Sequence, residues 1–86
     1  MIKRDLHPVG WAFFNYELDD AHEHLGNLLK LLADDPDYSE EEFRVELGHV
    51  YAHLNRSCFR RNLPEDFPSS EWDSASKYPS DLDPVG

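Results

Sequence analysis

The residues of this sequence best suited to chemistry are histidines and carboxylates that fall within two predicted helices. Glu46-x-x-His49 has the spacing found in di-iron carboxylate bundles, and Asp19-x-x-His22 partly repeats it. In those bundles, both side chains of the motif point inward between the helices. The heptad register of this chain, with apolar residues at positions a and d, instead puts Asp19 at b and His49 at c, which face outward. The motif therefore does not predict a di-iron site.

The same register brings a different set of residues together at the edge of the predicted helix seam. Because g positions lie beside g positions in an antiparallel pair, His24 should fall between Glu46 and His53. Two imidazoles and one carboxylate can bind a divalent metal and leave one coordination position open. The same residue types also form purely structural hydrogen bonds at seam edges. We expect no cofactor, and a metal or small-ligand site at His24, Glu46 and His53 is the alternative.

Two further polar pairs follow from the register. Glu17 at a g position should lie opposite Arg60, where the carboxylate and guanidinium would form an ion pair. On the other side of the seam, His22 at an e position should lie near Tyr51. These pairs would flank the apolar residues of the helix interface.

Arg56, Arg60 and Arg61 form the only basic patch of the chain. Cations near a helix C-terminus are favoured by the helix dipole, and the same arginines would also bind an anion or the acidic tail. Cys58 is the only cysteine, so neither an internal disulfide nor a cysteine pair for a metal can form. With no Ser/His/Asp arrangement and no glycine-rich phosphate loop, we expect no catalytic activity.

The first predicted helix covers residues 8–33. Its apolar residues recur at alternating spacings of three and four, which is typical of a helix with one apolar stripe. The pattern stops at Pro36, because the residue before a proline is pushed away from helical angles. The members of this a/d series are Trp11, Phe14, Leu18, Ala21, Leu25, Leu28 and Leu32.

The second predicted helix covers residues 39–62 and follows an acidic loop at 34–38. Ser39 and Glu42 have the spacing of a capping box, in which each residue bonds to the backbone N–H of the other. Pro64 ends the helix. Since the connection is short, the two helices should form an antiparallel hairpin, which makes the fold class all-α.

The remaining segment, 63–86, is an extended tail rich in Pro, Ser and Asp that we expect to pack on the hairpin. Phe67, Trp72 and Tyr78 are the residues suited to anchor it, because they can bury large apolar surfaces. A hairpin of two helices buries one seam, and both helices carry apolar residues away from that seam. The tail can cover them, or two hairpins can pair as a homodimeric four-helix bundle, and we expect some of both.

The length and the charge of the chain limit the number of domains and the classes of partner that it can have. The 86 residues make one small domain, residues 1–86, close to the lower limit for independent stability. The net charge of −10 disfavours binding to nucleic acid or to an anionic membrane. No signal peptide and no bilayer-long apolar run is recognisable, so we expect a cytoplasmic location. The sequence thus favours a small acidic, non-enzymatic module that interacts with itself or with another protein.

Overall fold

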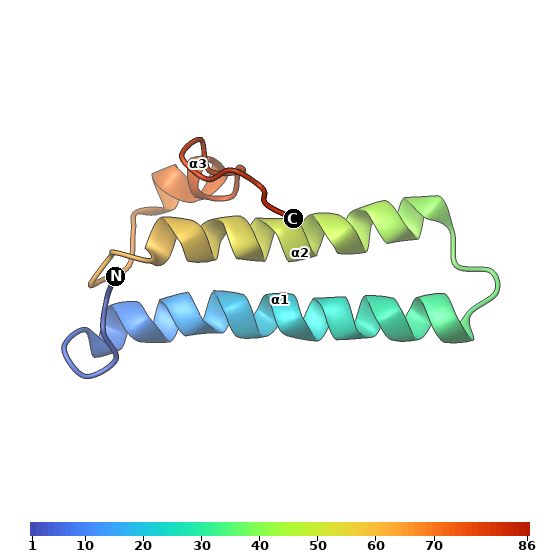
Figure 1. Ribbon diagram of the computed structural model, residues 1–86, viewed down its shortest axis with the longest axis horizontal. Helices are drawn as coiled ribbons and strands as arrows, with labels where there is room; N and C mark the ends of the chain where they lie inside the picture. The colour runs from blue at the N-terminus through green and yellow to red at the C-terminus, as the bar shows by residue number, and fades with distance from the viewer.

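The computed structural model describes residues 1–86 and consists mainly of two long helices lying side by side (Figure 1). Helix α1 spans Pro8–Asp34, and helix α2 spans Glu40–Arg60. They pack antiparallel and no strand is present, so the predicted all-α hairpin is confirmed. The first helix begins at the predicted residue, and the other observed ends differ from 8–33 and 39–62 by one or two residues. Neither helix has the length and hydropathy needed to span a bilayer.

The connection between the helices is held by side-chain caps. The Glu42 N–H donates to Ser39 Oγ at 3.1 Å, and the Ser39 N–H donates to Glu42 Oε2 at 3.2 Å. This is the predicted capping box, which satisfies two backbone donors at the start of α2. In the preceding turn, Asp35 Oδ1 accepts from the Asp37 N–H at 2.9 Å. These bonds fix the reversal of the chain between the two helices.

The sequence predicted an extended tail, but the tail is not extended throughout. It contains a 3₁₀ turn, η1, at Ser69–Glu71, followed by a short helix, α3, at Trp72–Ala75. This segment lies against the C-terminal half of α2 (Figure 1). The Asn55 side chain donates to the Ser76 carbonyl at 2.8 Å, which satisfies a backbone acceptor at the end of α3. This contact from α2 holds the end of the short helix against the hairpin.

The three aromatic residues proposed as tail anchors are buried to different degrees. Phe67 is buried, with its ring centroid 5.1 Å from that of Phe59 in an edge-on arrangement. Trp72 and Tyr78 remain nearly half exposed, at 46% and 48%. The most deeply buried residue of the tail is Ala75, at 1% exposure, which packs closely because its side chain is small.

A second connection, which we call the clasp, joins the N-terminal segment and the first turn of α1 to the segment that follows α2. The Ile2 N–H donates to the Arg61 carbonyl at 2.8 Å, and the Gly10 N–H donates to the Pro64 carbonyl at 2.9 Å. Ile2 is 5% exposed, and Gly10 is also buried. A Cβ atom on Gly10 would lie 2.1 Å from the Leu63 carbonyl oxygen. Only glycine therefore permits this close approach.

The seam between α1 and α2 is rotated from the one that periodicity predicted. Ala21 and Leu28, at d positions, are 3% exposed as expected. The a-position leucines of α1 are 38–52% exposed, whereas Glu17, at a g position, is only 4% exposed. The expectation that a and d residues together fill the seam is wrong for those leucines, because charged g-position side chains occupy their place. The a-position leucines are Leu18, Leu25 and Leu32.

Gly10→Ala should destabilise the fold, because its methyl group would overlap the backbone of the clasp. We expect the free energy of unfolding to fall by about 2 kcal/mol or more, typical of overpacking against atoms that cannot move away. Gly26→Ala is the control, since nothing lies within 4 Å of its Cβ position. It should raise helix stability by up to about 1 kcal/mol. Urea unfolding measures the free energy of unfolding of both variants. Equal effects of the two substitutions would contradict the close approach that the clasp requires at Gly10.

Candidate functional site

The polar centre of the hairpin is the carboxylate of Glu17, whose side chain is only 5% exposed. Arg56 Nε donates to Glu17 Oε2 at 2.7 Å, and Arg60 Nε makes a longer contact of 3.5 Å with the same oxygen. His53 Nδ1 lies 2.8 Å from Glu17 Oε1. The three partners are spaced three and four residues apart, so they share one face of α2. One carboxylate of α1 thus holds three residues of α2.

The two arginines continue from this carboxylate to the tail. Arg56 Nη1 donates to Ser76 Oγ at 2.8 Å, and its guanidinium lies 4.1 Å from the centroid of the Trp72 ring. Arg60 Nη1 donates to Asp66 Oδ1 at 2.8 Å. Both side chains are almost fully buried, and buried guanidinium groups are stable only when their donors are satisfied. The same charges therefore join α1, α2 and the tail.

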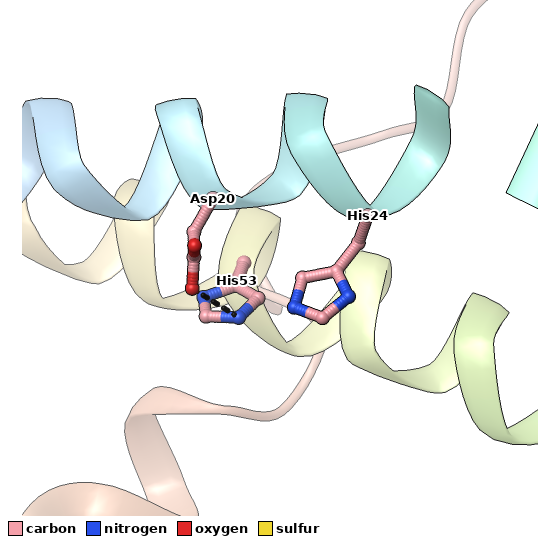
Figure 2. A group of neighbouring side chains, drawn as sticks. All are labelled: Asp20, His24 and His53. Atoms are coloured by element: carbon pink, nitrogen blue, oxygen red, sulfur yellow. Dashed lines mark ion pairs between the residues drawn. The ribbon is translucent and has the colours of Figure 1, made fainter. Parts of the chain in front are cut away.

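A histidine cluster adjoins Glu17 toward the middle of the hairpin. His53 Nε2 lies 3.1 Å from Asp20 Oδ2, and the rings of His24 and His53 stack with centroids 5.3 Å apart. His24 Nδ1 lies 2.5 Å from Glu46 Oε1, and the His49 ring meets the His24 ring edge-on at 5.2 Å. Figure 2 shows Asp20 and His24 on one helix facing His53 on the other. All of these groups lie at the seam edge and retain access to solvent.

The three residues proposed from the sequence lie around His24, but they fall into two groups with metal-binding ligand types. One group is Asp20, His24 and His53, and the other is His24, Glu46 and His49. In each group, the candidate ligand atoms lie within 4.8 Å of one another. Sequence reasoning missed Asp20. Its position four residues before His24, on the same helix face, was the available signal.

Of the two flanking pairs, only one is brought together. Glu17 and Arg60 are in contact, although Arg56 is the closer partner of Glu17. His22 and Tyr51 are both exposed, and no hydrogen bond or ring contact joins them. The rotation of the seam accounts for this difference, because it turns Glu17 and Arg60 inward and leaves His22 and Tyr51 exposed.

The basic patch contacts the tail through each of its members. Arg61 Nη2 donates to Asp81 Oδ2 at 3.0 Å, and its Nη1 donates to the Cys58 carbonyl at 2.7 Å. Arg56 and Arg60 are occupied as described above. Their donors are thus directed toward groups of this chain, which leaves little of the patch to receive an external anion.

A groove of about 740 Å³ lies beside the Glu17 network. Its walls include Val9, Phe13 and Tyr16 of α1 and Trp72 of the tail, and the charged side chains of Glu17 and Arg60 also border it. The arginine stacks on the Phe13 ring at 4.9 Å from its centroid. The groove is therefore apolar at its walls, with its charged groups already paired.

Comparison with known proteins finds no similarity: no family model, no curated protein and no solved structure matches this chain.

Glu17→Gln should destabilise the fold strongly, because it leaves buried Arg56 without a counter-charge and leaves Arg60 with Asp66 alone. We expect a loss of about 3 kcal/mol in the free energy of unfolding, as for other broken buried ion pairs. Glu23→Gln makes the same chemical change at an exposed site of α1 and should alter stability by less than about 0.5 kcal/mol. Chemical denaturation of both variants checks this difference. Similar stabilities would show that Glu17 does not hold the helices together.

Asp66 should make the fold sensitive to acid. The hydrogen bond from Arg60 holds the pKa of the Asp66 carboxyl below its ordinary value of 3.8. A carboxyl whose pKa is lower in the folded state adds stability above pH 3.8, and this stability disappears as the pH falls through the folded-state pKa. Asp66→Asn should therefore be less stable than the wild type at pH 6, with the difference shrinking toward pH 2. Thermal unfolding across this pH range tests the trend, and a constant difference would contradict it.

Proposed function

We propose that this chain is a small non-enzymatic module that associates with a second copy of itself, so that two hairpins form a four-helix bundle. The observation that supports this proposal is the exposure of leucines at heptad positions along one side of the hairpin. We call this side the leucine flank. It consists of Leu18, Leu25, Leu29 and Leu32 of α1 with Tyr51 and Leu54 of α2, which are 38–62% exposed.

The spacing of these residues favours a helical partner. Leu18, Leu25 and Leu32 recur every seven residues, which is the period of side chains that pack between adjacent helices. In an antiparallel pair, the a and e positions of both helices lie on the same side, so Leu54 and Tyr51 extend the same surface. A partner that presents two antiparallel helices would match it along its length. A second copy of this hairpin presents such a surface, and two-fold symmetry would pair the flank with itself.

The distribution of charge also favours association at this flank. Apart from Glu40 in the first turn of α2, no a or e position of either helix carries a carboxylate. The net charge of −10 is therefore displaced from the flank, although two copies would still repel each other at long range. That repulsion is screened by salt, so higher ionic strength should strengthen the proposed dimer.

Leu25→Glu should disrupt the dimer, because a symmetric interface would bury the introduced charge twice. Each lost leucine removes about 1.5 kcal/mol or more of burial energy, which for two copies corresponds to a roughly 100-fold rise in the dimer dissociation constant. Sedimentation equilibrium at several concentrations measures this constant. The wild type should approach twice the chain mass of 10.0 kDa.

Leu31→Glu is the matched control, since Leu31 is 40% exposed on the same helix but outside the leucine flank. It should dimerise like the wild type, and circular dichroism should show both variants to be helical. A wild-type chain that stays monomeric at all concentrations would refute the proposal. Equal dissociation constants for the two variants would place any association on another surface, such as the groove beside Trp72.

A further inference from the structure

We propose that Asp20, His24 and His53 bind a divalent transition-metal ion, with zinc as the ion that best fits two imidazoles, one carboxylate and an open fourth position. This inference does not depend on self-association, because the site lies on the g side of the seam and the leucine flank lies on the a and e side. It rests on which ring nitrogens of the two histidines are already engaged by other carboxylates.

The hydrogen bonds of His53 leave Nε2 directed at Asp20. Nδ1 lies 2.8 Å from the buried Glu17 carboxylate, and an unprotonated Nδ1 at this distance would set its lone pair against a negative oxygen. The proton therefore belongs on Nδ1, which makes Arg56 Nη2, 3.1 Å away, a neighbour rather than a donor to it. Nε2 is then the nitrogen available as a ligand, and it lies 3.1 Å from Asp20 Oδ2.

His24 is oriented in the same way by a different carboxylate. Its Nδ1 is paired with Glu46 Oε1 at 2.5 Å, which leaves Nε2 as the free nitrogen. Figure 2 shows one ring nitrogen of His24 turned toward the ring of His53. Both histidines thus have a carboxylate on Nδ1, an arrangement that in metal sites fixes the tautomer and raises the basicity of the ligand nitrogen.

Without a metal ion, a proton must bridge His53 Nε2 and Asp20 Oδ2, which lie 3.1 Å apart, and a divalent ion would replace that proton. Asp20 and the two histidines each offer an electron-pair donor, and one ligand atom of each residue lies within 4.8 Å of the others. Protonating both imidazoles would place two positive rings in a stack with centroids 5.3 Å apart. One divalent ion would satisfy all three donors at once. Tetrahedral zinc holds its ligand atoms about 3.3 Å apart, so His24 needs only a small side-chain movement.

The surroundings are suitable for an ion that exchanges with solvent. The side chains of His53, Asp20 and His24 are 14%, 24% and 28% exposed, so the fourth position opens to water. Three protein ligands plus water is the coordination of zinc sites that activate water or bind a small anion. The buried arginines beside Glu17 keep the site rigid. They hold in place the Glu17 carboxylate, which in turn orients the His53 ring.

Calorimetric titration of the purified, chelator-treated chain with zinc sulfate tests the proposal. We expect one zinc ion per chain and a rise in the melting temperature when zinc is present. Asp20→Asn removes a ligand while preserving shape, and it should weaken zinc binding by about tenfold or more. Asp19→Asn is the control, because it makes the same charge change at the neighbouring, exposed residue of α1 and should bind like the wild type.

His49→Gln separates this site from the neighbouring group formed by His24, Glu46 and His49. The proposal expects this variant to keep the zinc affinity of the wild type. No zinc binding by a chain that circular dichroism shows to be folded would overturn the proposal. The proposal would also be wrong if His49→Gln lost zinc binding while Asp20→Asn retained it. Equal losses of zinc affinity in Asp20→Asn and Asp19→Asn would contradict it as well.

Discussion

The buried carboxylate of Glu17 is the constraint on which the rest of this structure depends. Removing a charge from water costs several kcal/mol, so the side chain must find cationic partners wherever the helices place it. Arg56 and Arg60 meet this need, and each then requires partners for its remaining donors. Those partners, Ser76 and Asp66, belong to the tail. The relative rotation of the helices and two of the contacts that hold the tail are therefore linked to one residue.

Placing charge in the seam has a consequence on each side of the hairpin. On the g side, the helices bring His24 and His53 together with Asp20, because these residues continue the helix face that carries the ion cluster. On the opposite side, Leu18 and Leu25 are turned outward instead of filling the interface. The proposed metal site and the proposed self-association thus have a common origin, although neither requires the other.

Much of the hairpin could be predicted from the sequence, because its signals are local. The capping box of Ser39 and the helix stop at Pro36 depend only on neighbouring residues, and they set the helix ends to within one or two positions. The pairing of Glu17 with Arg60 also followed from the register. The rotation of the seam did not, because periodicity assumes that apolar side chains fill the interface. Asp20 was missed because only g positions were considered for the cluster around His24.

The clasp gives the hairpin a property that two helices joined by one turn would lack. With Ile2 bonded to Arg61 and Gly10 bonded to Pro64, the helix pair is closed at both ends, so that its backbone forms a ring of contacts. Ordinary helix hairpins fray from their open end, where local opening costs little free energy. Here that end is tied by the longest-range hydrogen bonds in the backbone. Opening of the seam should therefore be cooperative. Hydrogen exchange of the backbone amides in the two helices should then report one common free energy of opening.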